Sequence, residues 1–153
     1  MSERVRDSSN ETYDLEALLD RGLATYTPAN ARDGLEDRVR GISGADNETL
    51  LALYNAAHCL IFMSFSEGFG WPILEAQASG CPLICSNRTS VPEVAGEGAL
   101  IHEPDDYAAI AGDIQRLQEP AVRDKLAALG FRNAQGYSIE RMMGAYEEIY
   151  RRI

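Results

Sequence analysis

Two glutamates in the middle of the chain carry the strongest chemical signal of the sequence. Glu67 and Glu75 stand eight positions apart in the stretch S-E-G-F-G-W-P-I-L-E, around a Gly-Phe-Gly turn. Gly68 and Gly70 have no side chains, so a ligand can approach the backbone closely there. Carboxylates accept hydrogen bonds from vicinal hydroxyls, and a helix that begins near Pro72 directs N–H groups toward a phosphate. The pattern suggests a site for polyol, diphosphate and polyol, which is the outline of a nucleotide sugar.

The same two glutamates also have a purely structural explanation. A glutamate in the first turn of a helix is favoured by the helix dipole alone, and a glutamate in a loop is usually solvated. The turn does not match the dinucleotide-binding pattern G-x-G-x-x-G, because Ile73 occupies the third glycine position. Taken alone, the two carboxylates leave both interpretations open.

The surrounding elements must position these residues, and their pattern predicts short apolar strands alternating with helices. The expected strands are 58–63, 82–86 and 99–102, and the expected helices are about 47–57, 71–79, 105–118, 120–130 and 138–151. Such alternation is typical of βαβ units and of a parallel sheet whose strands are covered on both sides. The loop after strand 58–63 then lies at the carboxyl edge of the sheet, where ligands bind in this class.

Several polar residues are expected to begin helices. Asp46 or Asn47 can cap the first of them, and Ser138 can cap the last. The run from Ser90 to Glu93 has the spacing of a capping box and predicts a short helical turn. A further short helix is expected within the polar N-terminal segment, over residues 15–23.

Composition restricts the class of protein. With 153 residues, 45% of them hydrophobic and 25% charged, the chain has the make-up of one globular domain. A formal net charge of -10 and the lack of a basic run argue against nucleic-acid binding. No apolar run approaches the roughly 20 residues that span a bilayer. The polar N-terminus does not resemble a signal peptide, so a cytoplasmic location is expected.

The cysteines and histidines do not predict a metal site. Cys59, Cys81 and Cys85 lie among apolar residues, which is typical of buried free thiols in a reducing compartment. A structural zinc ion needs about four ligands, and neither His58 nor His102 completes a second pair beside the C-x3-C spacing. We therefore expect no bound metal.

The motif and its flanks resemble the C-terminal domain of the group-one retaining glycosyltransferases, which have the two-domain GT-B fold. The resemblance rests on S-E-G-F-G-W-P-I-L-E-A-Q-A-S-G-C-P-L-I-C-S, S-V-P-E-V-A-G, L-E-D-R-V-R-G, N-E-T-L-L-A-L-Y-N-A-A-H and A-L-I-H-E-P-D-D. These segments follow the family's order and spacing over residues 33–153. The implied fold is α/β, a three-layer Rossmann-like parallel sheet forming an incomplete GT-B C-terminal domain. Residues 1–32 are expected to be a polar leader, poorly ordered or partly helical.

The resemblance implies a binding site for a nucleotide-sugar donor. Glu67 corresponds to the catalytic-site glutamate beside the transferred sugar, although the resemblance does not make it the nucleophile. The implied donor-binding residues are Gly68, Phe69, Gly70, Trp71 and Glu75. In the family, backbone amides of the turn contact sugar hydroxyls and phosphate oxygens, and the second glutamate holds the ribose hydroxyls.

The implied activity is transfer of a hexosyl unit from a nucleotide sugar to a hydroxyl acceptor, with retention of configuration. The stretch E-A-Q-A-S-G-C-P-L-I-C-S-N looks closest to mannosyl-transferring members that use a GDP sugar, with a UDP sugar as the alternative. No metal or other cofactor is expected, because the family binds diphosphate with basic residues and a helix end. The Asp-x-Asp pattern of a metal clamp does not occur in this sequence.

Other residues near the motif have two interpretations each. Ser90, Pro92 and Glu93 match a family segment near the donor pocket, but they also simply begin a helix. Asn87 and Arg88 could face the ligand or the solvent. Packing in the core or in a second layer is expected for Tyr54, His58, Met142 and Met143.

The resemblance also predicts what this chain lacks. Family members have an N-terminal acceptor-binding domain, and a Gly-Arg turn with a following lysine clamps the donor diphosphate. No such pattern occurs in residues 1–46, and Lys125, the single lysine, lies downstream of the motif. We therefore expect weak or no activity of the chain alone. The alternatives are one subunit of a split transferase, joined by a partner chain or by self-association at an exposed sheet edge, and a non-catalytic nucleotide-sugar-binding or interaction module.

Overall fold

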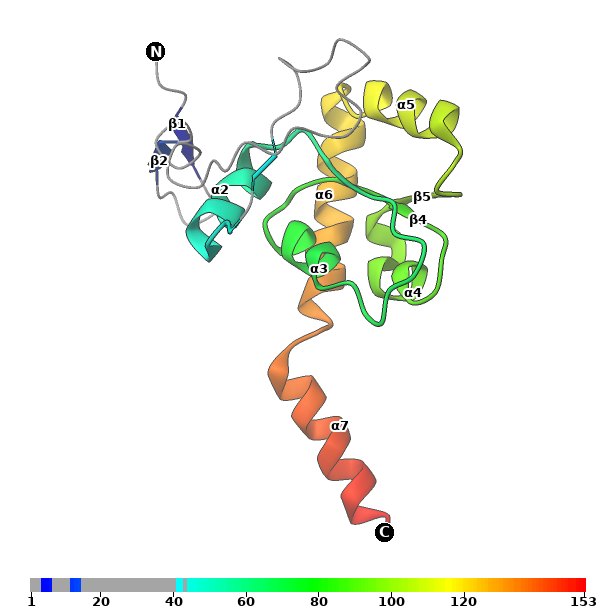
Figure 1. Cartoon of the computed structure of the whole chain (residues 1–153). Helices are drawn as coiled ribbons and strands as arrows, with labels where there is room; N and C mark the ends of the chain where they lie inside the picture. The colour runs from blue at the N-terminus through cyan, green and yellow to red at the C-terminus, as the bar shows by residue number, and fades with distance from the viewer. Residues whose placement is uncertain (1–3, 7–11, 15–40, 43) are drawn as a thin grey trace. The chain divides into compact units, whose positions relative to one another are not determined.

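The computed structural model describes residues 4–6, 12–14, 41–42 and 44–153 (Figure 1). The chain divides into two compact units, Met1–Ala56 and Ala57–Ile153. The helix expected over residues 15–23 lies outside the described residues, and the leader over residues 1–32 stays a prediction. None of the described helices is long and apolar enough to cross a membrane.

The described residues of the first unit form two short strands and one helix. Strand β1 (Arg4–Arg6) pairs antiparallel with β2 (Thr12–Asp14), inside the segment for which the sequence predicts a leader. Helix α2 (Asn47–Ala56) begins where the Thr49 N–H donates to the Asp46 carboxylate at 2.9 Å. The predicted Asp46 cap is therefore confirmed.

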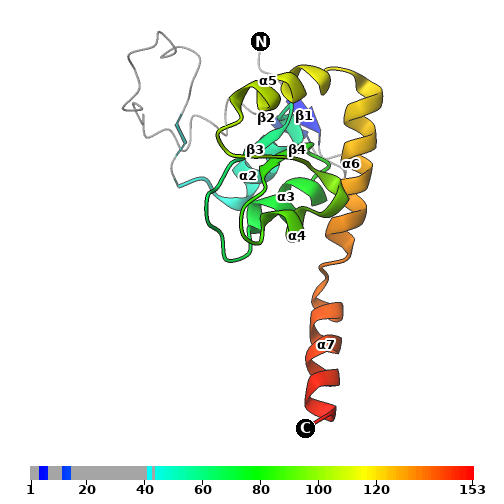
Figure 2. The same ribbon diagram turned by 90° about the vertical axis from the view of Figure 1, so that its right-hand side faces the viewer.

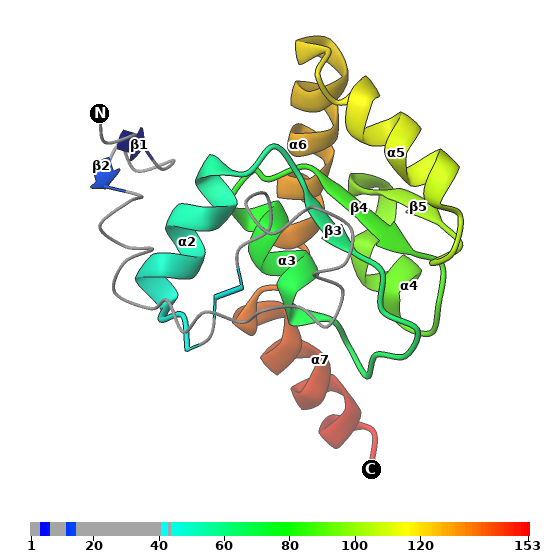
Figure 3. The same ribbon diagram turned by 45° about the horizontal axis from the view of Figure 1, so that its top comes forward.

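The second unit is built on a parallel sheet of three strands. They are β3 (Leu60–Phe62), β4 (Leu83–Ser86) and β5 (Leu100–His102), in the order β3–β4–β5, as Figure 3 shows. Ile61 lies opposite Ile84 in the register. All three predicted strands are confirmed, each shorter than its apolar run, and β3 has one neighbour among the described strands.

Five α-helices and one 3-10 helix complete the second unit. They are α3 (Trp71–Ala78), α4 (Val91–Ala95), η1 (Gly96–Gly98), α5 (Tyr107–Arg116), α6 (Pro120–Gln135) and α7 (Ile139–Arg151). Helix α6 continues beyond its predicted end near residue 130. Gly130 therefore lies inside the helix. A Cβ there would lie 3.0 Å from Gln77 Cγ, so the glycine allows the Gln77 side chain to pack closely against α6.

Successive side chains of β4 enter two different cores. Leu83 and Cys85 pack in the core formed with α3 and α4, whereas Ile84 packs in the core formed with α5 and α6. This alternation is the period of a strand, and it confirms the predicted α/β arrangement with helices on both faces. Coverage is less complete at the edge: Ile61 of β3 is 46% exposed, so the prediction that this strand is covered on both sides is wrong.

Buried amides connect α3, α4 and α6. The Gln77 side chain is 1% exposed. Its Nε2 donates to Ala95 O at 2.8 Å and to Gly98 O at 3.2 Å, and its Oε1 accepts from Asn133 Nδ2 at 2.8 Å. Asn133 also donates to Val94 O at 2.8 Å. Each amide hydrogen thus has an acceptor, which removes the desolvation penalty of burying the group.

Helix α7 packs in neither core and extends away from the sheet (Figures 1 and 2). Ser138 Oγ accepts from the Arg141 N–H at 3.3 Å, which confirms the predicted cap. Met142 and Met143 are each 51% exposed, so the prediction that they pack in the core or in a second layer is wrong. Helix α7 has an apolar side, but the chain turns away from the sheet after α6, so that side does not pack against the sheet.

The packing predicts opposite effects for two glycine-to-alanine substitutions. A Cβ at Gly98 would lie 2.4 Å from Gly130 Cα and 2.6 Å from Gln77 Nε2, so Gly98→Ala should lower the unfolding free energy. We expect a loss of about 1–3 kcal/mol. Gly112 in exposed α5 has no atom within 4 Å of that position, so Gly112→Ala should add about 0.5–1 kcal/mol. Urea unfolding followed by circular dichroism measures both, and equal midpoints would contradict the close packing of η1 on α6.

Candidate functional site

Two loops at the carboxyl edge of the sheet form the candidate site. Residues 63–70 connect β3 to α3, and residues 87–90 connect β4 to α4. Parallel strands end at the same edge, so these loops are neighbours. A hydrogen bond of 2.6 Å from Ser86 Oγ, at the end of β4, to Ser64 O ties the first loop to the strand that precedes the second. The motif therefore lies in the loop after β3, at the carboxyl edge of the sheet, as the sequence predicts.

The second loop holds the backbone of Glu67. The Glu67 N–H donates to Thr89 Oγ1 at 3.0 Å, and Ser90 Oγ donates to Glu67 O at 3.0 Å. Ser90 Oγ also lies 3.3 Å from Phe69 O. Ser90 occupies the N-cap position of α4 but makes no side-chain capping bond, so the predicted capping box does not form. The Ser90 hydroxyl instead donates to the backbone of the neighbouring loop.

In the first loop Glu67 is half-buried and Gly68 is exposed. The Glu67 carboxylate makes no hydrogen bond or ion pair with any other residue that the structure describes. A Cβ at Gly68 would meet no atom within 4 Å. Gly70 is needed for a different reason, because its φ is 95° and a Cβ there would lie 2.9 Å from Ile73 Cδ1. Gly68 thus leaves space for a ligand, whereas Gly70 allows the chain to enter α3.

The start of α3 offers fewer donors than the sequence suggests. Pro72 has no N–H, and the Ile73 N–H donates to Gly70 O at 3.0 Å. Trp71 therefore has the one N–H among the first three helical residues that could face a phosphate. The first turn contains no acidic residue, so the prediction that Glu75 lies in that turn is wrong. The dipole effect is confined to the first turn, which weakens the purely structural explanation of Glu75.

An aromatic cluster borders the turn. The Phe69 ring lies 4.9 Å from the Trp71 ring and 5.9 Å from the Tyr137 ring, between centroids. Tyr137 precedes α7, and its hydroxyl donates to Glu93 O at 3.2 Å. Trp71 remains 64% exposed. The sequence did not predict that Tyr137 lies beside the turn, because it is far from Phe69 along the chain and no local pattern links the two residues.

Asn87 and Arg88 point to a carboxylate at the end of β5. Asn87 Nδ2 donates to Glu103 Oε1 at 2.7 Å, and Arg88 Nη2 donates to Glu103 Oε2 at 2.5 Å. The Asn87 N–H also donates to His102 O at 2.9 Å. These contacts fix the second loop to β5. The hydroxyl-bearing residues and Glu103 were not predicted as supports, although their positions after neighbouring parallel strands could have signalled them.

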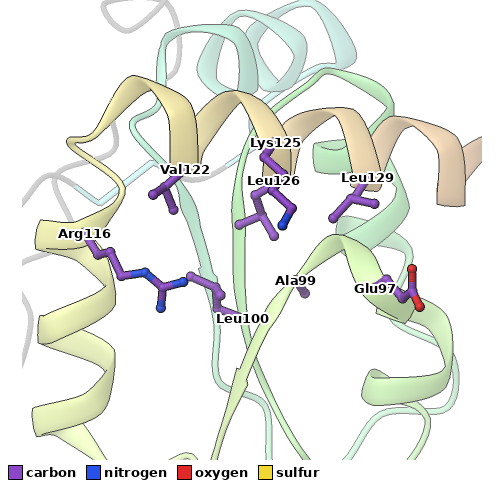
Figure 4. Close-up of a pocket in the computed structure, with 8 residues that line it drawn as sticks. All are labelled: Glu97, Ala99, Leu100, Arg116, Val122, Lys125, Leu126 and Leu129. Atoms are coloured by element: carbon purple, nitrogen blue, oxygen red, sulfur yellow. The ribbon is translucent and has the colours of Figure 1, made fainter.

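Two other predicted groups lie elsewhere in the unit. His58 is exposed, and its Nε2 lies 3.1 Å from Ile114 O, so it contacts α5 and is not a core residue. Lys125 lines a pocket of about 200 Å³ together with Glu97, Arg116 and apolar side chains from β5 and α6 (Figure 4). This pocket contains no motif residue, which agrees with the prediction that Lys125 does not clamp a diphosphate.

Cys81 and Cys85 are buried thiols, and Cys59 is half-buried. Burial raises the pKa of Cys81 to about 11, with a smaller contribution from the neighbouring Cys59 thiol, and it raises the pKa of Cys85 to about 12. Burial also raises the pKa of Cys59. Among the described residues, no three His, Cys, Asp or Glu side chains form a group that could hold a metal ion.

Comparisons with known proteins identify relatives. The family model "Glycosyl transferases group 1" matches residues 30–130, which is more than half of the chain. The chain is 42% identical over 106 residues to O-antigen chain mannosyltransferase B of Escherichia coli, covering 69% of this chain and 28% of that protein. It is 30% identical over 125 residues to D-inositol 3-phosphate glycosyltransferase of Streptomyces scabiei, covering 78% and 28%. The chain thus spans less than a third of either relative.

The burial of the thiols predicts their reactivity. At pH 8 a pKa of about 11 leaves on the order of a hundredfold less thiolate than a pKa of 9.0, and thiolate is the reacting form. We expect Cys81 and Cys85 to react with an aromatic disulfide reagent at least a hundredfold more slowly in the native chain than in urea.

The same pKa shifts predict the pH dependence of stability. The folded-state values lie above the unfolded value of 9.0, so stability from the protonated thiols is complete below pH 9. It should be lost as the pH rises toward 11–12. Urea unfolding at a series of pH values measures this loss. Similar reaction rates of Cys81 and Cys85 in the native and the unfolded chain would contradict the burial on which both predictions rest.

Proposed function

Because the chain belongs to the group 1 glycosyltransferases, we propose that its second unit carries the donor side of a hexosyl-transfer site. The observation that carries this proposal is the held backbone of Glu67 beside the exposed Gly68, at the carboxyl edge of β3. Ligands of open parallel sheets bind at this edge. The donor class is a nucleotide sugar, and the reaction is transfer of its hexosyl unit to a hydroxyl acceptor with retention of configuration.

In this proposal each residue of the site contacts a different part of the donor. The Glu67 carboxylate accepts hydrogen bonds from hydroxyls of the transferred sugar, which enters on the open side of Gly68. The Trp71 N–H, at the positive end of α3, faces the diphosphate. Glu75, one turn further along α3, accepts from the ribose hydroxyls. No metal or resident cofactor takes part in these contacts.

A mannosyl unit on GDP is the donor that we favour. The Escherichia coli relative described above is called a mannosyltransferase, and so is a Mycolicibacterium hassiacum protein named MMP alpha-(1->4)-mannosyltransferase, 38% identical over 96 residues. That match covers 63% of this chain and 20% of the second protein. A UDP-linked sugar is the alternative, and binding distinguishes the two.

Donor affinity should be low. The chain has a net charge of -10, and Arg88, the basic residue beside the site, is paired with Glu103. Two charge-assisted contacts to a diphosphate are worth roughly 1.5–3 kcal/mol each. Without them, binding is weaker by about two to four decades. We therefore expect dissociation constants near the millimolar range and weak or no transfer by this chain alone.

A split transferase is the second candidate function. The outer edge of β3 has no partner among the described strands, and the apolar side chains of α7 are exposed. Both features favour assembly with further polypeptide, whether a partner chain or a second copy. Transfer activity that appears only on adding such a chain would favour this candidate over a non-catalytic binding module.

Calorimetric titration tests the donor site and the division of roles. Wild-type protein is titrated with GDP-mannose, UDP-glucose, GDP and UDP. Glu75→Gln should weaken GDP and GDP-mannose alike by roughly tenfold or more, because the lost contact is to the ribose. Glu67→Gln should weaken GDP-mannose by a similar factor and leave GDP unchanged.

Glu97→Gln provides the matched control, since Glu97 is an exposed glutamate of the separate pocket. It should bind all four ligands as the wild type does. Absence of heat with every ligand, up to concentrations well above the expected millimolar dissociation constants, would refute the donor site. Equal weakening of GDP by Glu67→Gln and Glu75→Gln would refute the division of roles.

A further inference from the structure

Both backbone groups of Glu67 are bound from the neighbouring loop. Thr89 Oγ1 accepts from its N–H at 3.0 Å, and Ser90 Oγ donates to its C=O at 3.0 Å. The two contacts together fix the orientation of the Glu67 backbone, and hence the direction in which its Cβ leaves. The carboxylate itself has no partner among the described residues, so its position depends on this backbone support.

Thr89 adopts a conformation that a β-branched residue rarely takes. Its φ is 50°, and it is the one non-glycine residue with positive φ among those the structure describes. A β-branched residue in the left-handed region is strained. Glycine would occupy this backbone more easily, but glycine has no hydroxyl for the Glu67 N–H. A strained threonine thus stands where glycine would be unstrained, and its hydroxyl binds the backbone N–H of Glu67.

The loop that carries Thr89 is anchored independently of the motif. Glu103, after β5, accepts from Asn87 Nδ2 and Arg88 Nη2, and His102 O accepts from the Asn87 N–H. The loop is thus tied to β5 on one side and presents Thr89 and Ser90 to Glu67 on the other. A support fixed to the sheet in this way can hold a neighbouring loop in place.

We propose that Thr89 is a positioning residue that sets the Glu67 carboxylate against the sugar of the donor. It acts through the Glu67 N–H and touches no part of the ligand. This inference rests on the proposed function, because it assigns Thr89 to the sugar half of the same site. Placement of a contacting group matters on a scale of about 1 Å, so loss of the hydroxyl should affect sugar recognition and spare the nucleoside diphosphate.

Two substitutions separate positioning from general stability. Thr89→Gly removes the hydroxyl and also relieves the backbone strain, so the protein should unfold at an equal or higher temperature. Thr89→Ser keeps the hydroxyl and serves as the conservative rescue. A merely structural role predicts that binding of every ligand follows stability, whereas a positioning role predicts that sugar recognition is lost in a stable protein.

The first measurement needs no ligand. Amide hydrogen exchange by NMR follows the Glu67 N–H in the wild type, Thr89→Gly and Thr89→Ser. We expect protection of this amide in the wild type and in Thr89→Ser, and at least tenfold faster exchange in Thr89→Gly. Amides of β4 should exchange equally in all three proteins. An unchanged Glu67 rate in Thr89→Gly would overturn the inference.

The second measurement compares dissociation constants for GDP-mannose and GDP. In Thr89→Gly the constant for GDP-mannose should rise about three- to tenfold, the worth of one hydrogen bond, with GDP unchanged. Thr89→Ser should restore the wild-type ratio. Parallel weakening of both ligands, or an unchanged ratio, would overturn the inference while leaving the donor site standing. If the wild type binds neither GDP nor UDP ligands, the proposed function fails, and the exchange rates alone decide whether Thr89 holds Glu67.

Discussion

The hydrogen-bonded amides of buried Gln77 and half-buried Asn133 hold α3, α4, η1 and α6 together. Gln77 donates to two carbonyls at the end of α4 and in η1, and Asn133 links it to α6. A buried amide that lost one of these partners would carry a desolvation cost of about 1–3 kcal/mol. Any shift of α3 against α4 or α6 would break at least one contact, so the network selects a single arrangement. The glycines at 98 and 130 allow the close approach that the network requires.

The position of α3 in turn sets the geometry of the site. Gly70 enters the helix with positive φ, and Ile73 packs in the core directly behind it. The turn between Glu67 and Gly70 is thereby fixed at its helical end. Hydroxyls from the loop after β4 fix the other end. The backbone of the turn is thus held at both ends, as the proposed recognition of a polyhydroxylated ligand requires.

Electrostatics limit what this arrangement can do without help. In the proposed donor site the carboxylates would contact hydroxyls, but a diphosphate needs positive charge, and Arg88 is already paired with Glu103. One available N–H at the start of α3 compensates only in part. The described residues therefore suit the sugar and the ribose better than the phosphates between them. The proposed donor site therefore needs positive charge beyond that of the described residues.

Local pattern was sufficient for the three strands of the parallel sheet, for the caps at Asp46 and Ser138, and for the place of the Glu67–Glu75 motif at the edge of that sheet, but not for β1 and β2. These features depend on neighbours in sequence, such as an apolar run or a side chain three residues from an amide, so the sequence by itself determined them. It could not show that Ser90 leaves its own helix to bind Glu67, that Gly130 continues α6, or that Met142 is exposed. These outcomes depend on which segments meet in space. Only the tertiary structure decided them, because a hydroxyl or a glycine takes whichever partner packing brings within reach.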